Sequence, residues 1–252
     1  MLTLSLLFAG LFLPLFPLSM VFNELFDRIR DVRLRIALLL IWPQIGIVVT
    51  HTVGIELPGW IIFWALLTAV LYGVRALALR DVGLWTSFIA TSAWAVLWVT
   101  VDNTAELSQL VFYAVGFSAP LALLVLLSNE LENRFGAAYT GLYGGLALTL
   151  PRLSGVLVMV VLAIIATPLF PAFSAMLATI IDSAAHSFTT AITVGGIWLL
   201  WSWAGTRLLH GLIIGPAHEE STADLSLNAV WLYTAILGLL AISGIYSIGY
   251  LS

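Results

Sequence analysis

Apolar residues fill most of this chain in eight long runs, and charged residues fall almost entirely between them. A helix that crosses the hydrocarbon core of a bilayer needs about 20 consecutive, largely apolar residues. Eight segments meet this requirement: 2–22, 36–54, 60–79, 83–101, 107–129, 153–181, 184–212 and 227–251. The connections are short, except for 135–152, which has room for a short interfacial piece. The pattern predicts one domain over residues 1–252, an all-α, polytopic transmembrane bundle of about eight helices.

Composition assigns the chain to the membrane and excludes several kinds of site. Of its residues 62% are hydrophobic and only 9% are charged, whereas about a quarter of a soluble domain is charged. Cysteine is absent, which excludes disulfides and thiolate metal sites. The net charge of −4 gives no reason to expect a nucleic-acid partner. The N-terminus has neither a basic region nor a small-x-small cleavage site, so the first run is predicted to be a retained span and not a signal peptide.

The basic residues predict the orientation of the bundle. Lysine is absent, and all nine basic residues are arginines. Eight alternating spans place every one of them on the same side: Arg28, Arg30, Arg33, Arg35, Arg75, Arg80, Arg134, Arg152 and Arg207. The opposite side receives acidic residues: Glu56, Asp102, Glu106 and Asp182. Because basic loops stay in the cytoplasm, both termini should lie outside, with the chain in a bacterial-type inner (cytoplasmic) membrane.

The densest basic cluster, Arg28, Arg30, Arg33 and Arg35, follows the first run and is interleaved with acidic residues. Either this cluster docks a peripheral cytoplasmic subunit, or it serves only to fix the topology. The sequence favours neither alternative.

Two predicted spans contain the same tetrapeptide, P-L-F-P, near the middle of the membrane. Pro14 and Pro17 lie in the first span, and Pro168 and Pro171 lie in the sixth. A proline removes a backbone donor and clashes with the preceding turn, and an unsatisfied backbone group in lipid costs several kcal/mol. Broken helices in corresponding positions of oppositely oriented halves mark the mid-membrane site of many transporters. The alternative is a pair of kinks whose freed groups are satisfied by neighbouring helices.

Five stretches carry a resemblance to a known family: FAGLFLPLFPLS (8–19), LYGVRALALRDVGLWTSF (71–88), GGLALTLPRLSGVLVMVVLAIIATPLFPAF (144–173), GGIWLLWSWAGTRLLHGLIIGP (195–216) and DLSLNAVWL (224–232). The chain resembles the antiporter-like membrane subunits of respiratory complex I (chains L, M and N of NADH–quinone oxidoreductase) and of Mrp-type cation/proton antiporters. The P-R-L-S-G and D-L-S pieces are moderately specific, and the rest of the match depends on order and spacing. The resemblance implies a half-length form that corresponds to the family's helices seven to fourteen, with both termini outside.

The departures from the family pattern concern the residues that move protons. The resemblance implies a relay of buried lysines, a histidine and a lysine or glutamate at mid-membrane. Carried over position by position, these fall on residues without a charge: Phe12, Ile41, Gly83, Val115 and Met176. Asp81, which matches the family's aspartate, is retained. Since an ionisable group in a membrane costs at least about 2.5–3.5 kcal/mol and is kept only for a function, a chain without these groups is predicted not to conduct protons.

Few polar groups remain as candidates for an ion pathway. Asp182 and His186 are four residues apart, hence neighbours on a continuous helix, and would form an outer proton port. His51, near the outer end of the second span, and Asp81 are the other candidates. A single histidine at the end of a span is more often a hydrogen-bonded interface residue. The sequence H-E-E at 218–220 does not complete an H-E-x-x-H motif, so neither a metal site nor a cofactor is predicted.

Three functions are consistent with these observations. The first is a non-conducting, antiporter-like accessory subunit of a larger energy-coupled complex, of respiratory or inorganic-carbon-uptake type. Its partners would be other membrane subunits, chiefly a full-length antiporter-like chain, together with lipid and a peripheral cytoplasmic subunit. The second is a channel or carrier subunit that moves a small neutral or anionic species, or protons, itself. The third, an enzyme, ranks last because no set of nucleophile, base and metal ligands is present; any redox chemistry would belong to the complex.

Overall fold

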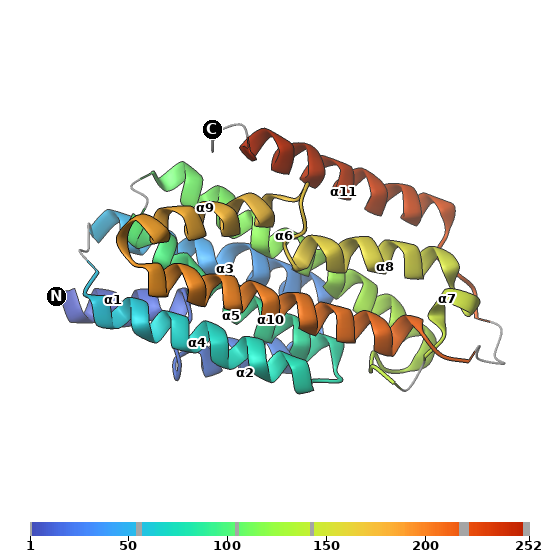
Figure 1. Ribbon diagram of the computed structural model, residues 1–252. Helices are drawn as coiled ribbons and strands as arrows, with labels where there is room; N and C mark the ends of the chain where they lie inside the picture. The colour runs from blue at the N-terminus through green and yellow to red at the C-terminus, as the bar shows by residue number, and fades with distance from the viewer. Residues whose placement is uncertain (1, 54–56, 104–105, 142–143, 217–221, 249–252) are drawn as a thin grey trace.

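The computed structural model describes residues 2–53, 57–103, 106–141, 144–216 and 222–248. This part of the chain forms eleven helices and no strand. The helices are α1 (Leu2–Phe12), α2 (Ser19–Arg28), α3 (Val32–Val53), α4 (Gly59–Ala78), α5 (Val82–Asn103), α6 (Leu107–Phe135), α7 (Leu146–Thr149), α8 (Pro151–Ile164), α9 (Pro171–His186), α10 (Phe188–Ile213) and α11 (Leu227–Ile248). They pack side by side in one bundle (Figure 1), which confirms the predicted all-α architecture.

Both spans with paired prolines are built from two helices in place of one. α1 and α2 occupy the predicted first span, and α8 and α9 occupy the predicted sixth. α8 and α9 meet near the middle of the bundle (Figure 1). Each of these four helices is shorter than the roughly 20 residues that cross a bilayer, so the two halves of each span must be stacked end to end.

Five helices are long and apolar enough to cross a membrane by length and composition: α3, α4, α5, α6 and α11. Of these, α5 and α6 lie mostly buried, whereas α3 and α11 expose most of their surface. An exposed helix with this composition is stable only beside lipid or another apolar partner, because water would surround its apolar side chains. The chain is therefore an integral membrane protein.

The centre of the bundle is rich in tryptophan. Trp85, Trp94, Trp98 and Trp201 are all fully buried. Mid-bundle tryptophan differs from the usual placement of this residue in belts at headgroup depth. Trp201, which its position near a span end marks as an interface anchor, instead donates its indole N–H to Ser92 Oγ at 2.8 Å.

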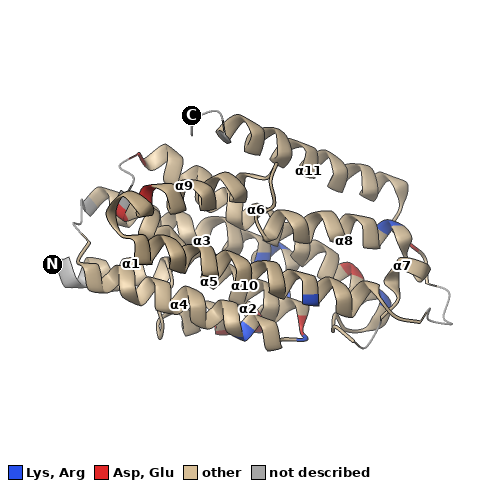
Figure 2. Cartoon of the chain, viewed as in Figure 1, with Lys and Arg blue, Asp and Glu red and all other residues tan. Residues whose placement is uncertain are grey.

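Figure 2 shows acidic residues and no basic residue, among those described, at the end of the bundle near the N-terminus. The basic residues lie from the middle of the view to the opposite end (Figure 2). Every charged residue that the structure describes is at least partly exposed, since no charged residue is among the buried ones. No charged side chain is therefore fully enclosed in the described bundle.

Candidate functional site at the two helix breaks

The first break, residues 13–18 between α1 and α2, frees backbone carbonyls in the bundle interior. In a continuous helix the carbonyl of Leu13 would accept the N–H of residue 17, but Pro17 has none. Trp98 supplies the missing donor, with its indole N–H 2.9 Å from the Leu13 oxygen. Trp42 donates in the same way to the Leu11 carbonyl at 3.0 Å.

The N–H and the carbonyl of Phe16, in the first break, are also hydrogen-bonded to a neighbouring helix. Trp64 donates its indole N–H to the carbonyl of Phe16, and the N–H of Phe16 donates to Thr68 Oγ1 at 3.1 Å. Both partners belong to α4. Three tryptophans and one threonine, from α3, α4 and α5, therefore hold this break. None of these four side chains carries a charge.

The second break, residues 165–170 between α8 and α9, is closed by the same chemistry. Trp198 of α10 donates its indole N–H to the carbonyl of Ile165 at 2.9 Å. Thr167 donates two hydrogen bonds to the carbonyl of Leu162, one from its backbone N–H at 3.2 Å and one from its hydroxyl at 2.9 Å. In both breaks, therefore, an uncharged indole N–H from a neighbouring helix donates a hydrogen bond to a backbone carbonyl that the break has freed.

Two glycines allow neighbouring helices to approach the breaks closely. A Cβ on Gly46 of α3 would lie 2.8 Å from the backbone N of Leu13, and a Cβ on Gly244 of α11 would lie 2.1 Å from the carbonyl O of Leu169. Leu169 itself has a positive φ of 93°, a conformation that costs a non-glycine residue about 1–3 kcal/mol. The packing around the second break therefore holds a strained backbone in place.

The paired prolines have opposite environments in the two breaks. Pro14 is buried and Pro17 is exposed, whereas Pro168 is exposed and Pro171 is buried. The order along the chain is reversed, as expected if the two breaks are traversed in opposite directions. The breaks have the geometry of corresponding broken helices, and their freed groups are met by neighbouring helices, so both alternatives predicted from the sequence describe part of the structure.

Between the breaks runs a set of neutral polar contacts. Tyr72 and Ser19 share a hydrogen bond of 2.9 Å between their hydroxyls, and Thr91 donates to Asn23 Oδ1 at 3.2 Å. Trp94 donates to Ser118 Oγ at 3.0 Å. Near the outer end of α5, Thr100 and Thr179 share a hydrogen bond of 3.1 Å. These groups stabilise helix packing without any side chain that titrates near neutral pH.

One amide side chain of α3 has no hydrogen-bond partner among the described residues. The amide of Gln44 is buried at both its oxygen and its nitrogen, and neither atom has a hydrogen-bond partner. Burying an amide in this way costs roughly 1–3 kcal/mol. Gln44 therefore leaves an unused donor and an unused acceptor inside the bundle.

The five positions carried over from the family relay do not form one internal file. Met176 is fully buried, and the Phe12 ring is partly buried against Trp42, with ring centroids 4.8 Å apart. Ile41 and Val115, by contrast, are 56% and 39% exposed on the outside of this chain. A proton-carrying residue at either exposed position would face lipid or a partner, so the carry-over at these two positions does not describe an interior path.

The predicted outer port between Asp182 and His186 has no ion pair. His186 is exposed, and its Nδ1 lies 3.0 Å from the backbone carbonyl O of Asp182, not from its carboxylate. His51 is exposed at the end of α3. The structure therefore brings neither histidine into the interior, and their role in an ion pathway stays a prediction.

Asp81, at the start of α5, forms contacts that have a structural role. Its Oδ1 accepts the N–H of Leu84 at 2.8 Å, as an N-cap residue does. Its backbone pairs with Tyr139, and its negative charge raises the pKa of the Tyr139 phenol above the ordinary value, because ionisation would place two negative charges side by side. Asp81 thus ties the connection after α6 to α5, and no relay partner adjoins it in the described chain.

The basic cluster after α2 divides into structural and free residues. Arg28 pairs with Glu24 at 2.7 Å, and Arg35 donates to the carbonyl of Ile29 at 2.6 Å and lies over the ring of Phe26. Arg30 and Arg33 are exposed, and neither forms an ion pair within the described residues. Arg28, Arg30 and Arg33 are all exposed, and the docking role predicted for the four-arginine cluster stays a prediction.

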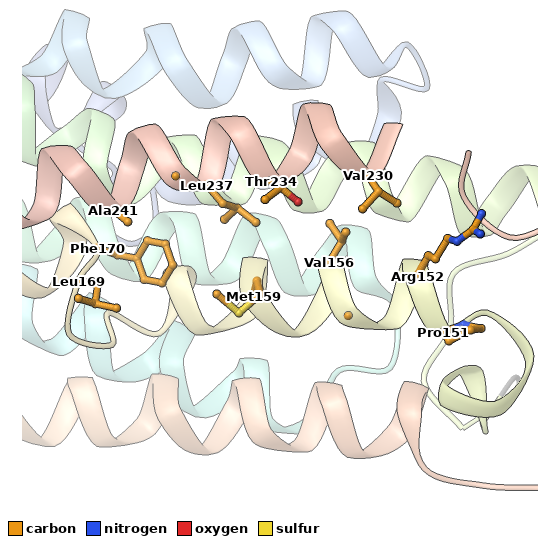
Figure 3. A pocket seen from close by; sticks show the side chains of 12 residues that line it. Pro151, Arg152, Val156, Met159, Leu169, Phe170, Val230, Thr234, Leu237 and Ala241 are labelled. Carbon is orange, nitrogen blue, oxygen red and sulfur yellow. The ribbon is translucent and has the colours of Figure 1, made fainter. Parts of the chain in front are cut away.

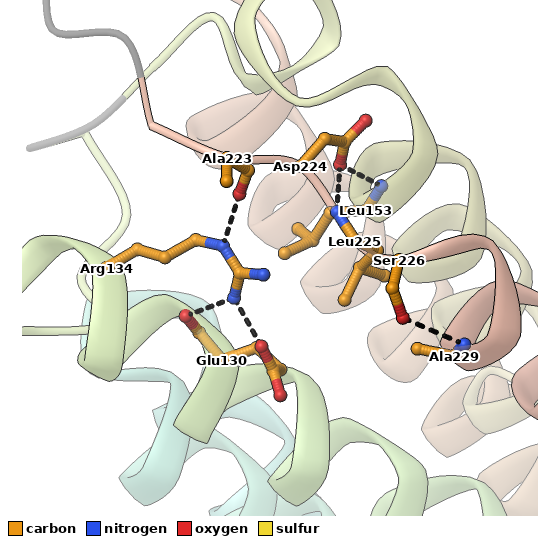
Figure 4. Close-up of polar contacts among 8 residues, drawn as sticks. All are labelled: Glu130, Arg134, Leu153, Ala223, Asp224, Leu225, Ser226 and Ala229. Atoms are coloured by element: carbon orange, nitrogen blue, oxygen red, sulfur yellow. Dashed lines mark hydrogen bonds and ion pairs between the residues drawn. The ribbon is translucent and has the colours of Figure 1, made fainter.

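The two most specific sequence motifs contact each other. The carboxylate of Asp224, from D-L-S, accepts the backbone N–H groups of Arg152 at 2.8 Å and Leu153 at 3.1 Å, both from P-R-L-S-G. Arg134 at the end of α6 donates to the carbonyl of Ala223 at 2.9 Å and pairs with the Glu130 carboxylate (Figure 4). The segment before α11 therefore caps α8 and is anchored to α6, which gives both motifs a structural role.

The second break also borders an apolar groove between α8 and α11 (Figure 3). It has a volume of about 480 Å³, with Leu169 and Phe170 at one end and Arg152 at the other. Its walls are mainly aliphatic, and Thr234 contributes a hydroxyl. No acid or histidine lines the groove, so it offers an approach to the break without offering a proton carrier.

Comparison with known proteins establishes the fold. No family model and no curated protein matches this chain, but solved structures do. A chain of respiratory complex I from Thermus thermophilus matches with a TM-score of 0.82 and 20% identity, over 94% of this chain and 53% of that one. The chain therefore shares the fold of this part of the complex I chain.

Two further solved structures share this fold. A chain of the membrane-bound sulfane sulfur reductase, an archaeal respiratory membrane complex, matches with a TM-score of 0.82 and 16% identity, over 96% of this chain and 52% of that one. A chain of the Mrp complex from Dietzia sp. DQ12-45-1b matches with a TM-score of 0.73 and 17% identity, over 86% and 42%. This chain spans about half the length of the chains it matches. The resemblance predicted from the sequence is confirmed at the level of fold.

Sequence reasoning missed the tryptophans that close the breaks. Trp98 lies three residues from the end of the predicted span 83–101, and Trp42 lies six residues from the start of the span 36–54. Near the end of a span, a tryptophan is expected to be an interface anchor, so position along the chain gave no signal for the role of Trp98.

Proposed function

We propose that this chain is a non-conducting, antiporter-like subunit of a larger energy-coupled membrane complex. The observation that carries the proposal is the chemistry of the breaks, where the freed carbonyls receive indole N–H groups. A relay member must accept a proton on one side and release one on the other. An indole N–H only donates a hydrogen bond and does not titrate, so Trp98, Trp42 and Trp198 satisfy the backbone without passing a proton.

The neutral interior supports the same conclusion. Among the described residues no charged side chain and no histidine is buried, and the buried polar groups are uncharged: Ser, Thr and Asn side chains, the Gln44 amide and the Tyr72 hydroxyl. Hydroxyl groups need water or a titratable neighbour to begin proton transfer. The resemblance implies that relatives place lysines in this region. Loss of those charges leaves the broken helices as a structural feature that shapes the bundle for its partners.

The partners we propose are membrane subunits, chiefly a lysine-bearing, full-length antiporter-like chain. Chains of this fold occur in multi-subunit complexes, and this chain spans about half their length. Its outer helices α3 and α11 expose apolar faces along most of their length. Three statements remain predictions from the sequence: a peripheral cytoplasmic subunit at the cluster of Arg28, Arg30, Arg33 and Arg35, the bacterial cytoplasmic membrane, and a link to inorganic-carbon uptake.

Reconstitution tests the proposal directly. The purified chain, shown to be monodisperse and helical, is placed in liposomes that contain a pH-sensitive dye, and a pH gradient is imposed with valinomycin and potassium to clamp the potential. We expect the gradient to decay at the rate of empty liposomes, and a protonophore added at the end to collapse it. Proton flux that scales with the amount of protein would refute a non-conducting role.

The alternative, a channel or carrier for a small neutral or anionic species, is favoured by the buried, unpartnered amide of Gln44 in α3. The same liposomes decide it. Stopped-flow light scattering with glycerol or urea, and chloride or bicarbonate efflux, should give the rates of empty liposomes if the chain is an accessory subunit. Protein-dependent flux that is lost in Gln44→Leu would replace the proposal with a carrier function.

A further inference from the structure

A second polar site lies away from the breaks, at the end of the bundle that carries the arginines. The cavity has a volume of about 600 Å³ and is formed by the end of α4, the end of α10 and the connection after α6. Arg80, Arg207 and His210 line it together with Thr140. No acidic residue lines it, and neither arginine forms an ion pair within the described chain.

Backbone hydrogen bonds fix the walls of this cavity. The N–H of Thr140 donates to the carbonyl of Arg80 at 2.8 Å, and the N–H of Gly141 donates to the carbonyl of Gly211 at 2.9 Å. A Cβ on Gly211 would lie 2.9 Å from Thr140 Cβ, so the connection packs directly on α10. The basic residues are therefore held around one hollow by three tied segments, unlike isolated arginines on a free surface.

The wall also contains a buried donor without a partner. Trp85 lines the cavity and is 1% exposed, yet its indole N–H has no hydrogen-bond partner. Asp81, the residue after Arg80, carries a negative charge close to the site but does not line the cavity; its carboxylate accepts the N–H of Leu84. The lining thus combines two arginines that form no ion pair in the described chain with a histidine and a threonine hydroxyl, and no acidic residue, which is the chemistry of an anion site.

The surroundings of the cavity indicate which kind of anion would fit it. Towards the middle of the bundle, the adjoining surfaces of α4 and α10 expose Val74, Leu199 and Trp203 by 47%, 73% and 58%. A ligand with a phosphate at the arginines and acyl chains along this apolar strip would match both parts. Basic pockets between membrane helices at the cytoplasmic side commonly receive anionic headgroups.

We propose that this cavity, lined by Arg80, Arg207, His210 and Thr140, binds the headgroup of one anionic phospholipid, whose acyl chains lie along the apolar strip of α4 and α10. The site is separate from the helix breaks and does not depend on whether the chain conducts protons. Each arginine near an anionic headgroup contributes roughly a fivefold factor in affinity. Removing both should therefore weaken binding by about 25-fold.

Native mass spectrometry of the whole chain, with added phosphatidylglycerol or phosphatidylcholine, tests the site. The double variant Arg80→Gln/Arg207→Gln is compared with Arg30→Gln/Arg33→Gln, which removes the same charge from exposed, unpaired arginines. We expect the wild type to retain one phosphatidylglycerol in preference to phosphatidylcholine, the first variant to lose it by about 25-fold, and the second to keep it within about twofold. Equal losses in both variants, or equal retention of both lipids, would overturn the proposal.

Two further arms separate the lipid from other anions and from misfolding. Inorganic phosphate at millimolar concentration should fail to displace the lipid, since it lacks acyl chains; full displacement would identify a site for a free anion instead. A phosphatidylglycerol with a photoreactive acyl chain, applied to the wild type, should crosslink to α4 and α10 near Val74, Leu199 and Trp203. Crosslinks spread over all outer helices would reject a defined site without any variant.

Discussion

The replacement Trp98→Phe tests whether indole donors hold the first break. Phe keeps an aromatic ring at a fully buried position but cannot donate to the Leu13 carbonyl, which now receives a hydrogen bond of 2.9 Å. Because Pro17 cannot supply the helical N–H, that carbonyl has no other backbone donor. Hydrogen bonds within membrane proteins average about 0.6 kcal/mol, and a buried group left unpaired costs about 1–3 kcal/mol. We expect a loss of about 1–2 kcal/mol from the hydrogen bond.

Trp85→Phe is the matched control. Trp85 is buried to the same degree, and its indole N–H has no partner, so this variant loses ring volume without losing a hydrogen bond. The difference between the two variants isolates the donor. A loss of about 1 kcal/mol lowers the unfolding temperature of a chain of this size by about 2–4 °C. Trp98→Phe should therefore unfold about 2–8 °C below Trp85→Phe in detergent, as followed by the circular dichroism of the backbone, which does not depend on tryptophan fluorescence.

A third arm removes the donor without changing the shape. A benzothiophene analogue of tryptophan at position 98, incorporated during synthesis, replaces the N–H with sulfur and should reproduce most of the shift. If Trp98→Phe and Trp85→Phe unfold at the same temperature, and the analogue unfolds like the wild type, the carbonyl of Leu13 does not depend on the indole and the account of the break fails.

Three substitutions test the contacts that position the broken helices and cap α8. Gly46→Ala and Gly244→Ala place a methyl group within 2.8 and 2.1 Å of backbone atoms at the first and second breaks, and each should lower the free energy of unfolding by about 1–3 kcal/mol. Gly195→Ala is the control, because open space surrounds this position, and it should be neutral or stabilising. Equal effects of the three glycine variants on thermal unfolding would contradict the packing argument. Asp224→Ala removes the acceptor for the first N–H groups of α8 and should cost about 0.5–2 kcal/mol, whereas Asp224→Asn should retain much of it. Limited proteolysis of the segment before α11 checks this, and cleavage at the wild-type rate in Asp224→Ala would refute the role of the cap.

The sequence predicted the class and the course of the fold because bilayer physics leaves few choices. Apolar runs of about 20 residues favour membrane-spanning helices, and each paired-proline tetrapeptide favours a break in its helix, although single prolines at positions 43 and 120 lie inside continuous helices. The positions of both breaks follow from these rules, whereas the outer ends of the spans do not: α2 continues to Arg28, beyond the predicted end at residue 22. The partners of the freed carbonyls do not, because they depend on which side chains of distant helices reach the break, as Trp98 reaches Leu13 across 85 residues of chain.

The candidate site was less predictable than the fold. Alignment by spacing placed relay positions at Ile41 and Val115, yet a one-residue shift on a helix turns a side chain by about 100°, and both residues point outward in this chain. Asp81 was chosen for its charge and serves as a helix cap. The charge pattern was more robust, since it depends only on which loop a residue occupies, and the described arginines are absent from the end of the bundle that holds the N-terminus.

A polar group beside a broken membrane helix can do two separate things. It can satisfy the backbone, which needs only a donor or an acceptor in the right place, and it can carry a proton, which needs a group that changes its charge. A lysine ammonium is able to do both. Tryptophan does the first alone, and it does so without the cost of at least about 2.5 kcal/mol that a charge pays at mid-membrane. Replacing charged groups with indoles therefore removes conduction while it keeps the break, so the shape that partners recognise can outlast the activity that first required it.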